Sequence, residues 1–157
     1  MAVTEELLSD LVLEVWDVLL GLHVEESVDG SWGEASSEGF TSTIQWTGAS
    51  QGTLGLYTTV AFAELAAARM LNLSSREITR SDASDSCAEL ANVLGGNLQS
   101  VLPLPTHLSL PQVVTGTSPE FAACERSQRV VCLQFISAGQ PVQVSITGAA
   151  HEGARCG

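Results

Sequence analysis

Two short stretches, Phe40-Thr-Ser-Thr-Ile-Gln-Trp46 and Thr53-Leu-Gly-Leu-Tyr-Thr58, decide the fold class of this chain. In the first, positions 40, 42, 44 and 46 would lie on one face of a strand, and the threonines and glutamine between them on the other. The segment from Gly48 to Gly52 supplies turn residues between the two stretches. Together they predict a β-hairpin.

Helical patterns flank the hairpin on both sides. Before it, apolar residues recur every three or four positions from Leu8 to Leu19, with Thr4 as the expected N-cap and Gly21 as the stop. After it, a capping threonine precedes the alanine-rich range 60–73. We assign this second helix to the core scaffold, because small side chains suit close packing on a sheet.

A third helix is predicted over residues 82–102, where Pro103 and Pro105 end it because proline cannot continue the backbone hydrogen bonding. Beyond it, three extended segments follow: 107–115 (despite Pro111), 129–137 and 141–147. This order predicts an α+β fold, in which long helices pack on one face of a mostly antiparallel sheet. We expect one domain over residues 1–157, with 149–157 as a flexible tail.

Composition excludes several function classes. The 157 residues carry a net charge of -12, with 18 acidic residues against six arginines and no lysine, so nucleic-acid binding and anionic membranes are disfavoured. The N-terminus lacks the pattern of a signal peptide, and no apolar run is long enough for a membrane span, so we expect a cytoplasmic protein. The four cysteines show no CxxC spacing, and no metal site is expected.

The third helix has two distinct faces. A wheel at about 100° per residue predicts that one apolar stripe is buried; it comprises Cys87, Leu90, Ala91, Leu94, Leu98 and Val101. Asp85, Glu89, Asn92 and Gly96 follow the same spacing on the opposite side. Glu89 and Asn92 are therefore exposed neighbours, with about 5–6 Å between their Cβ atoms.

The glycines of this helix admit two interpretations. Consecutive glycines cost a helix about 1 kcal/mol each relative to alanine, a cost that is reasonable if a partner must approach the backbone. Gly95 sits at the border of the buried stripe, so a close contact between helix and sheet is the alternative. An outward Glu and Asn alone most often mean a solvated surface.

The segment from Asp85 to Asn97, with Glu89-Leu-Ala-Asn92 at its centre, resembles the signature of the CheC/CheX/FliY chemotaxis phosphatases, specifically the CheX-like branch. Three further segments match that family in order: the glycine-bearing hairpin from Trp46 to Leu54, the helix from Leu65 to Leu73, and the proline-marked strand from Leu110 to Gly116. The resemblance therefore spans about Ile44 to Gly116. The first helix and the last strands fit more loosely.

The resemblance implies a phosphatase of a phosphorylated CheY-like response regulator. Asn92 would orient the attacking water and Glu89 would bind the regulator's active-site lysine. Asp85, Ala88, Gly95 and Gly96 would contact the partner. No cofactor would be bound by this chain, because Mg²⁺ is expected in the regulator, and a homodimer is implied.

Other observations support or qualify this interpretation. The sequence contains no phosphate-binding glycine loop, cysteine nucleophile with an arginine loop, or two-metal cluster, and a catalyst that only positions water needs none of these. There are two departures from the family pattern. The pair Gly95-Gly96 is more flexible than a single glycine, and the absence of lysine favours local contacts over long-range steering. A non-catalytic regulator-binding or scaffold domain of the same fold, and a structural dimer with a merely solvated helix, remain alternatives.

Overall fold

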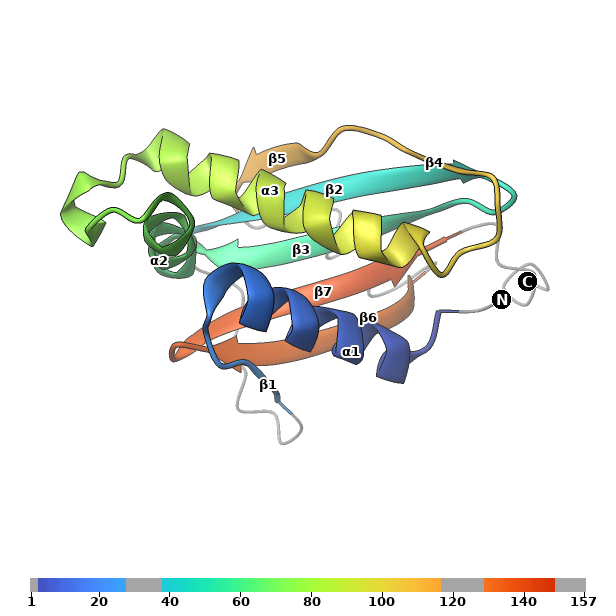
Figure 1. The fold of residues 1–157 in the computed structure, drawn as a ribbon, viewed down its shortest axis with the longest axis horizontal. Coiled ribbons are helices and arrows are strands. Elements are labelled where there is room, and N and C mark those ends of the chain that lie inside the picture. Colours follow the sequence, from blue (N-terminus) through green and yellow to red (C-terminus); the bar gives the residue numbers. More distant parts are fainter. Residues whose placement is uncertain (1–2, 28–37, 117–128, 149–157) are drawn as a thin grey trace.

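The computed structural model describes residues 3–27, 38–116 and 129–148. Within them, seven strands form one antiparallel sheet, ordered β1-β6-β7-β3-β2-β4, with β5 also paired to β2. Figure 1 shows the helices α1, α2 and α3 on one face of this sheet. The predicted α+β class with helices on one face is confirmed, whereas the expected tail 149–157 lies outside the described residues.

The hairpin forms as predicted. Strand β2 (Gly39–Gly48) pairs with β3 (Gly52–Thr59), and Ile44 lies opposite Leu54. Phe40, Ile44 and Trp46 belong to the buried core, whereas Gln45 is exposed. The alternation holds at residues 44–46, whereas Thr41, on the other face, is also buried and Thr43 is half-buried.

The first two helices begin at threonine caps. The Oγ1 of Thr4 accepts a hydrogen bond from Leu7 N at the start of α1 (Glu5–Val15), and the Oγ1 of Thr59 accepts one from Phe62 N at the start of α2 (Val60–Leu71). The first helix continues as the π-helical turn η1 (Trp16–Leu20) and stops at Gly21, whose φ is 64°. Asn72, also left-handed, ends α2 two residues before the predicted limit.

Trp16 joins the two ends of the chain in the core. Its ring stacks on Phe62 with 5.8 Å between centroids, and its Nε1 donates to Ser137 Oγ at 3.1 Å. The Ser137 hydroxyl donates in turn to the carbonyl of His23 at 2.7 Å. These contacts hold α1 and α2 over β6 (Arg129–Ser137), which pairs with β7 (Gln140–Thr147) and with the short β1 (Glu25–Glu26).

The predicted strand 107–115 is wrong as one element. It is divided into β4 (Thr106–Leu108) and β5 (Gln112–Thr115), which both pair with β2. Between them, Ser109 exchanges hydrogen bonds with Gln45: Ser109 N donates to Gln45 O at 2.8 Å, and Gln45 N donates to the Ser109 hydroxyl at 3.0 Å. Pro111, which has no N–H to donate, lies in this interruption.

The third helix also has different limits from those predicted. The helix α3 spans Arg80–Gln99 and follows the single turn η2 (Ser75–Glu77). Its N-cap is Thr79, which starts it two residues earlier than expected. At its end the backbone tightens, because Val101 N bonds to Leu98 O and Leu102 N bonds to Gln99 O, three residues back.

Candidate functional site

The start of α3 is held by reciprocal capping. The Asp82 N–H donates to Thr79 Oγ1 at 3.0 Å, and the Thr79 N–H donates to Asp82 Oδ2, also at 3.0 Å. Two backbone donors that would otherwise lack partners are satisfied in this way. The cap fixes where the helix begins and therefore the rotation at which its later residues face outward.

The buried face of α3 lies on the hairpin. It comprises Ala83, Ser86, Cys87, Leu90, Ala91, Leu94, Gly95 and Leu98. Figure 1 shows α3 running across β2 and β3, and both strands contact it. The predicted stripe is confirmed from Cys87 to Leu98; Val101 lies beyond the helix and is only half-buried.

The opposite face carries the residues singled out from the sequence. Asp85, Glu89, Asn92 and Gly96 are all exposed, and Ala88 between them is half-buried. No Cβ on Gly96 would meet another atom within 4 Å. Glu89 and Asn92 are thus adjacent side chains on open surface, at the three-residue spacing that makes them neighbours.

Gly95 differs from the other predicted contact residues, because it is buried. A Cβ added to it would lie 3.3 Å from Ile44 Cδ1 and 3.4 Å from Ile44 Cγ2. The close contact between helix and sheet, the alternative explanation of this glycine, accounts for its surroundings. The surface available to a partner therefore includes Gly96 and excludes the side of Gly95.

Cys87 lies beneath this surface in the core. Its Sγ is 3.3 Å from Thr58 Oγ1, and burial raises the pKa of its thiol to about 11, although the Thr58 hydrogen bond acts in the opposite direction. Because the thiolate is the reactive form, a cysteine with so high a pKa is inert at neutral pH. Cys87 is a structural residue in the helix-sheet contact.

A hollow that the sequence did not predict adjoins Glu89. It has a volume of about 310 Å³ and is lined by two residues from the last turn of α2 and four from α3: Met70, Leu71, Asp82, Asp85, Ser86 and Glu89. Leu71 is 51% exposed and contributes apolar surface to the hollow. The end of α2, which the sequence assigns to the core scaffold, therefore also borders the candidate site.

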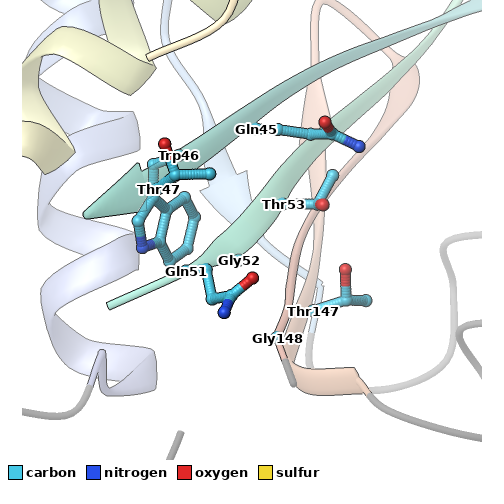
Figure 2. A pocket seen from close by; sticks show the side chains of 8 residues that line it. All are labelled: Gln45, Trp46, Thr47, Gln51, Gly52, Thr53, Thr147 and Gly148. Atoms are coloured by element: carbon cyan, nitrogen blue, oxygen red, sulfur yellow. The ribbon is translucent and has the colours of Figure 1, made fainter. Parts of the chain in front are cut away.

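A second hollow lies at the turn end of the hairpin (Figure 2), with a volume of about 250 Å³. Its lining combines threonines, amides, glycines and one indole: Gln45, Trp46, Thr47, Gln51, Gly52, Thr53, Thr147 and Gly148. Gly52 is required there, because any Cβ would collide with the Trp46 ring. The lining contains no charged group, imidazole or thiol, so its threonine hydroxyls have no neighbouring base within it to activate them.

The described residues contain neither a metal-binding cluster nor a membrane-spanning helix. Over ranges 3–27, 38–116 and 129–148, no group of three His, Cys, Asp or Glu side chains is arranged to hold a metal ion. None of the helices in those ranges is long and apolar enough to cross a membrane.

A family model described as chemotaxis phosphatase CheX matches residues 40–135, more than half of the chain. The chain belongs to this family. The match includes the hairpin, α2, α3, β4, β5 and most of β6, so the Glu89–Asn92 surface lies within it. No curated protein matches the chain.

Solved structures show the same CheX fold. The chemotaxis protein CheX from Vibrio vulnificus has a TM-score of 0.68 at 14% identity, with 89% of this chain and 92% of that chain covered. CheX from Desulfovibrio desulfuricans has a TM-score of 0.66 at 14% identity, with 90% of this chain and 96% of that chain covered. The CheX-CheY-BeF3-Mg complex from Borrelia burgdorferi has a TM-score of 0.65 at 13% identity, with 89% of this chain and 94% of that chain covered. At sequence identities this low, the similarity to these structures shows a shared fold and nothing further.

Proposed function

We propose that this chain is a phosphatase that accelerates hydrolysis of the aspartyl phosphate of a CheY-like response regulator. Asn92 orients the attacking water, and Glu89 binds the regulator's active-site lysine. The observation that carries the proposal is the pairing of these two exposed side chains, one turn apart on α3, in a chain of the chemotaxis phosphatase CheX family.

The chemistry asks little of this chain. The water oxygen attacks phosphorus, the bond between phosphorus and the aspartyl oxygen breaks, and inorganic phosphate and a free carboxylate are released. Asn92 accepts a hydrogen bond from the water and holds it in line, since orientation alone can supply a large part of a rate enhancement. Mg²⁺ and lysine in the regulator stabilise the charge on the phosphoryl group.

Two arrangements of this surface support the assignment of roles. Gly96 leaves open space beside Asn92, so the regulator can approach the helix backbone closely. Glu89 has no hydrogen bond or ion pair to another described residue, so its carboxylate is available to a lysine. The proposed partner class agrees with the Borrelia burgdorferi complex, which contains a CheX with CheY. The family resemblance further leads us to propose a cytoplasmic homodimer.

The decisive experiment follows the decay of phosphorylated response regulators, with Mg²⁺ present, and compares Asn92→Ala with Asn97→Ala. Asn97 is a half-buried residue of the same type on the same helix, outside the proposed surface. We expect Asn92→Ala to lower the limiting rate by about 100-fold, because displacing a positioned reactant costs about that factor. Asn97→Ala should stay close to the wild type.

The outcomes separate the competing functions. An Asn92→Ala variant as fast as the wild type would remove the catalytic role of Asn92. A wild-type chain that binds a regulator without accelerating decay would instead be the non-catalytic binding domain. Thermal unfolding of each variant verifies that a lost rate does not reflect a lost fold.

A further inference from the structure

We propose that the hollow between the end of α2 and the first half of α3 receives a basic side chain of the response regulator, with its aliphatic stem on Met70 and Leu71. The inference rests on the proposed function and extends it from the reaction to the choice of partner. The hollow adjoins the reaction surface directly, because Glu89 is part of both.

One wall of the hollow is apolar. Leu71, the last residue of α2, leaves 51% of its surface exposed, and Met70 beside it is half-buried. Exposed apolar surface in a depression next to a functional residue is typical of interaction sites. A partner group that enters here would remove this surface from water, so its stem should be aliphatic.

The other wall is acidic. Asp82, Asp85 and Glu89 follow one another at spacings of three and four residues, so their carboxylates lie along one side of α3 and repel each other. The Asp82 side chain accepts a hydrogen bond from the Thr79 N–H. Asp85 and Glu89, in contrast, have no ion pair within the described part of the chain. A cation from a partner would relieve the repulsion.

Three arginines lie close in sequence to the residues of the hollow: Arg69, Arg76 and Arg80. Arg69, on α2, donates to the carbonyl of Leu20 at 3.4 Å. Arg80, at the start of α3, lies 3.5 Å from Glu38 and over the ring of Phe40. None of the three lines the hollow, and we assign the neutralising charge to the regulator.

The geometry specifies where this charge lies on the regulator. Asp85 precedes Glu89 by four residues, which is about 6 Å along the helix axis. If Glu89 binds the active-site lysine, the second basic group lies about one helical turn away from it, on the side of α2. An arginine or lysine fits both walls, because its stem covers apolar surface while its charged end reaches a carboxylate.

The test measures dissociation constants and single-turnover rates with a phosphorylated regulator, or with the regulator activated by beryllofluoride for binding alone. Asp85→Asn is compared with Glu14→Gln, which removes one exposed charge from α1. Leu71→Ser is compared with Leu13→Ser, because Leu13 is 44% exposed on α1. The two control variants correct for net charge and for general loss of apolar surface.

We expect Asp85→Asn to weaken binding by about two- to fivefold, the range of an exposed ion pair. Leu71→Ser should weaken it by about three- to tenfold through lost apolar burial. Asn92 is intact in both variants, so both substitutions should act on the dissociation constant more than on the limiting rate. Glu14→Gln and Leu13→Ser should bind as the wild type does.

The failures can be told apart. If both hollow variants match their controls in affinity, the inference is overturned while the proposed phosphatase activity stands. If the wild type binds but does not accelerate decay, the proposed function fails, and the affinities still decide the role of the hollow. If no regulator binds, both are overturned.

Discussion

Gly95 lies against Ile44, and a Cβ on Gly95 would be only 3.3 Å from Ile44 Cδ1. Helix α3 therefore meets strand β2 through a residue without a side chain. This contact sets how deeply α3 sits on the sheet, and thereby how far its opposite face, with Glu89 and Asn92, stands out for a partner.

Gly95→Ala should destabilise the fold by about 1 kcal/mol, because an overpacked contact costs about 1–3 kcal/mol and outweighs the gain of about 1 kcal/mol in helix propensity. Urea unfolding measures the change. Ile44→Val removes the nearer of the two methyl groups, so the penalty should be smaller in that background. Strictly additive effects of the two substitutions would contradict the contact.

Gly96→Ala should have the opposite effect on stability. The added methyl group meets no atom within 4 Å, so the helix gains about 1 kcal/mol in the free energy of unfolding. If the regulator approaches this backbone, the same substitution raises the half-saturating concentration by about tenfold or more, since an extra methyl group in a packed contact costs about 1–3 kcal/mol. A more stable variant with unchanged affinity would remove Gly96 from the interface.

Thr79→Ala should cost about 1 kcal/mol of stability, the usual value for loss of an N-cap side chain. Thr79→Ser retains the hydroxyl that accepts the hydrogen bond from Asp82 N, so this variant should lose much less stability. Chemical unfolding of the two variants makes the comparison. Equal losses would mean that the threonine methyl group, rather than the cap, stabilises the start of α3.

The buried thiol of Cys87 predicts a loss of stability at high pH. Its pKa is raised from 9.0 to about 11 by burial, so above pH 9 the unfolded chain loses a proton that the folded chain keeps. The free energy of unfolding should therefore fall as pH rises from about 9 towards 11, at on the order of 1 kcal/mol per pH unit. Below pH 9 the protonated Cys87 thiol should contribute its full stabilisation to the folded state.

Cys87→Ala provides the reference for this titration, because other groups also ionise in the same range. The difference in unfolding free energy between wild type and variant should shrink as pH rises from 9 to 11. A difference that stays constant with pH would show that Cys87 does not carry the effect.

Local patterns were enough to predict most elements. Alternation in 40–46 placed Phe40, Ile44 and Trp46 in the core, although Thr41 between them is buried as well, and the spacing from Cys87 to Leu98 separated the two faces of α3. The limits were less accurate. The strand 107–115 is divided at Ser109, whose side-chain hydroxyl accepts the hydrogen bond from Gln45 N. This interruption depends on Gln45, which is far away in the sequence.

The sequence by itself determined which apolar residues of β2 and α3 face the core, because a helix or strand repeats its faces at a fixed period that neighbouring residues reveal. It therefore predicted that Glu89 and Asn92 are exposed. Only the tertiary structure decided which elements are neighbours. Leu71 and Asp85 belong to different helices, and they share a hollow because α2 packs on α3, so no local pattern could reveal it.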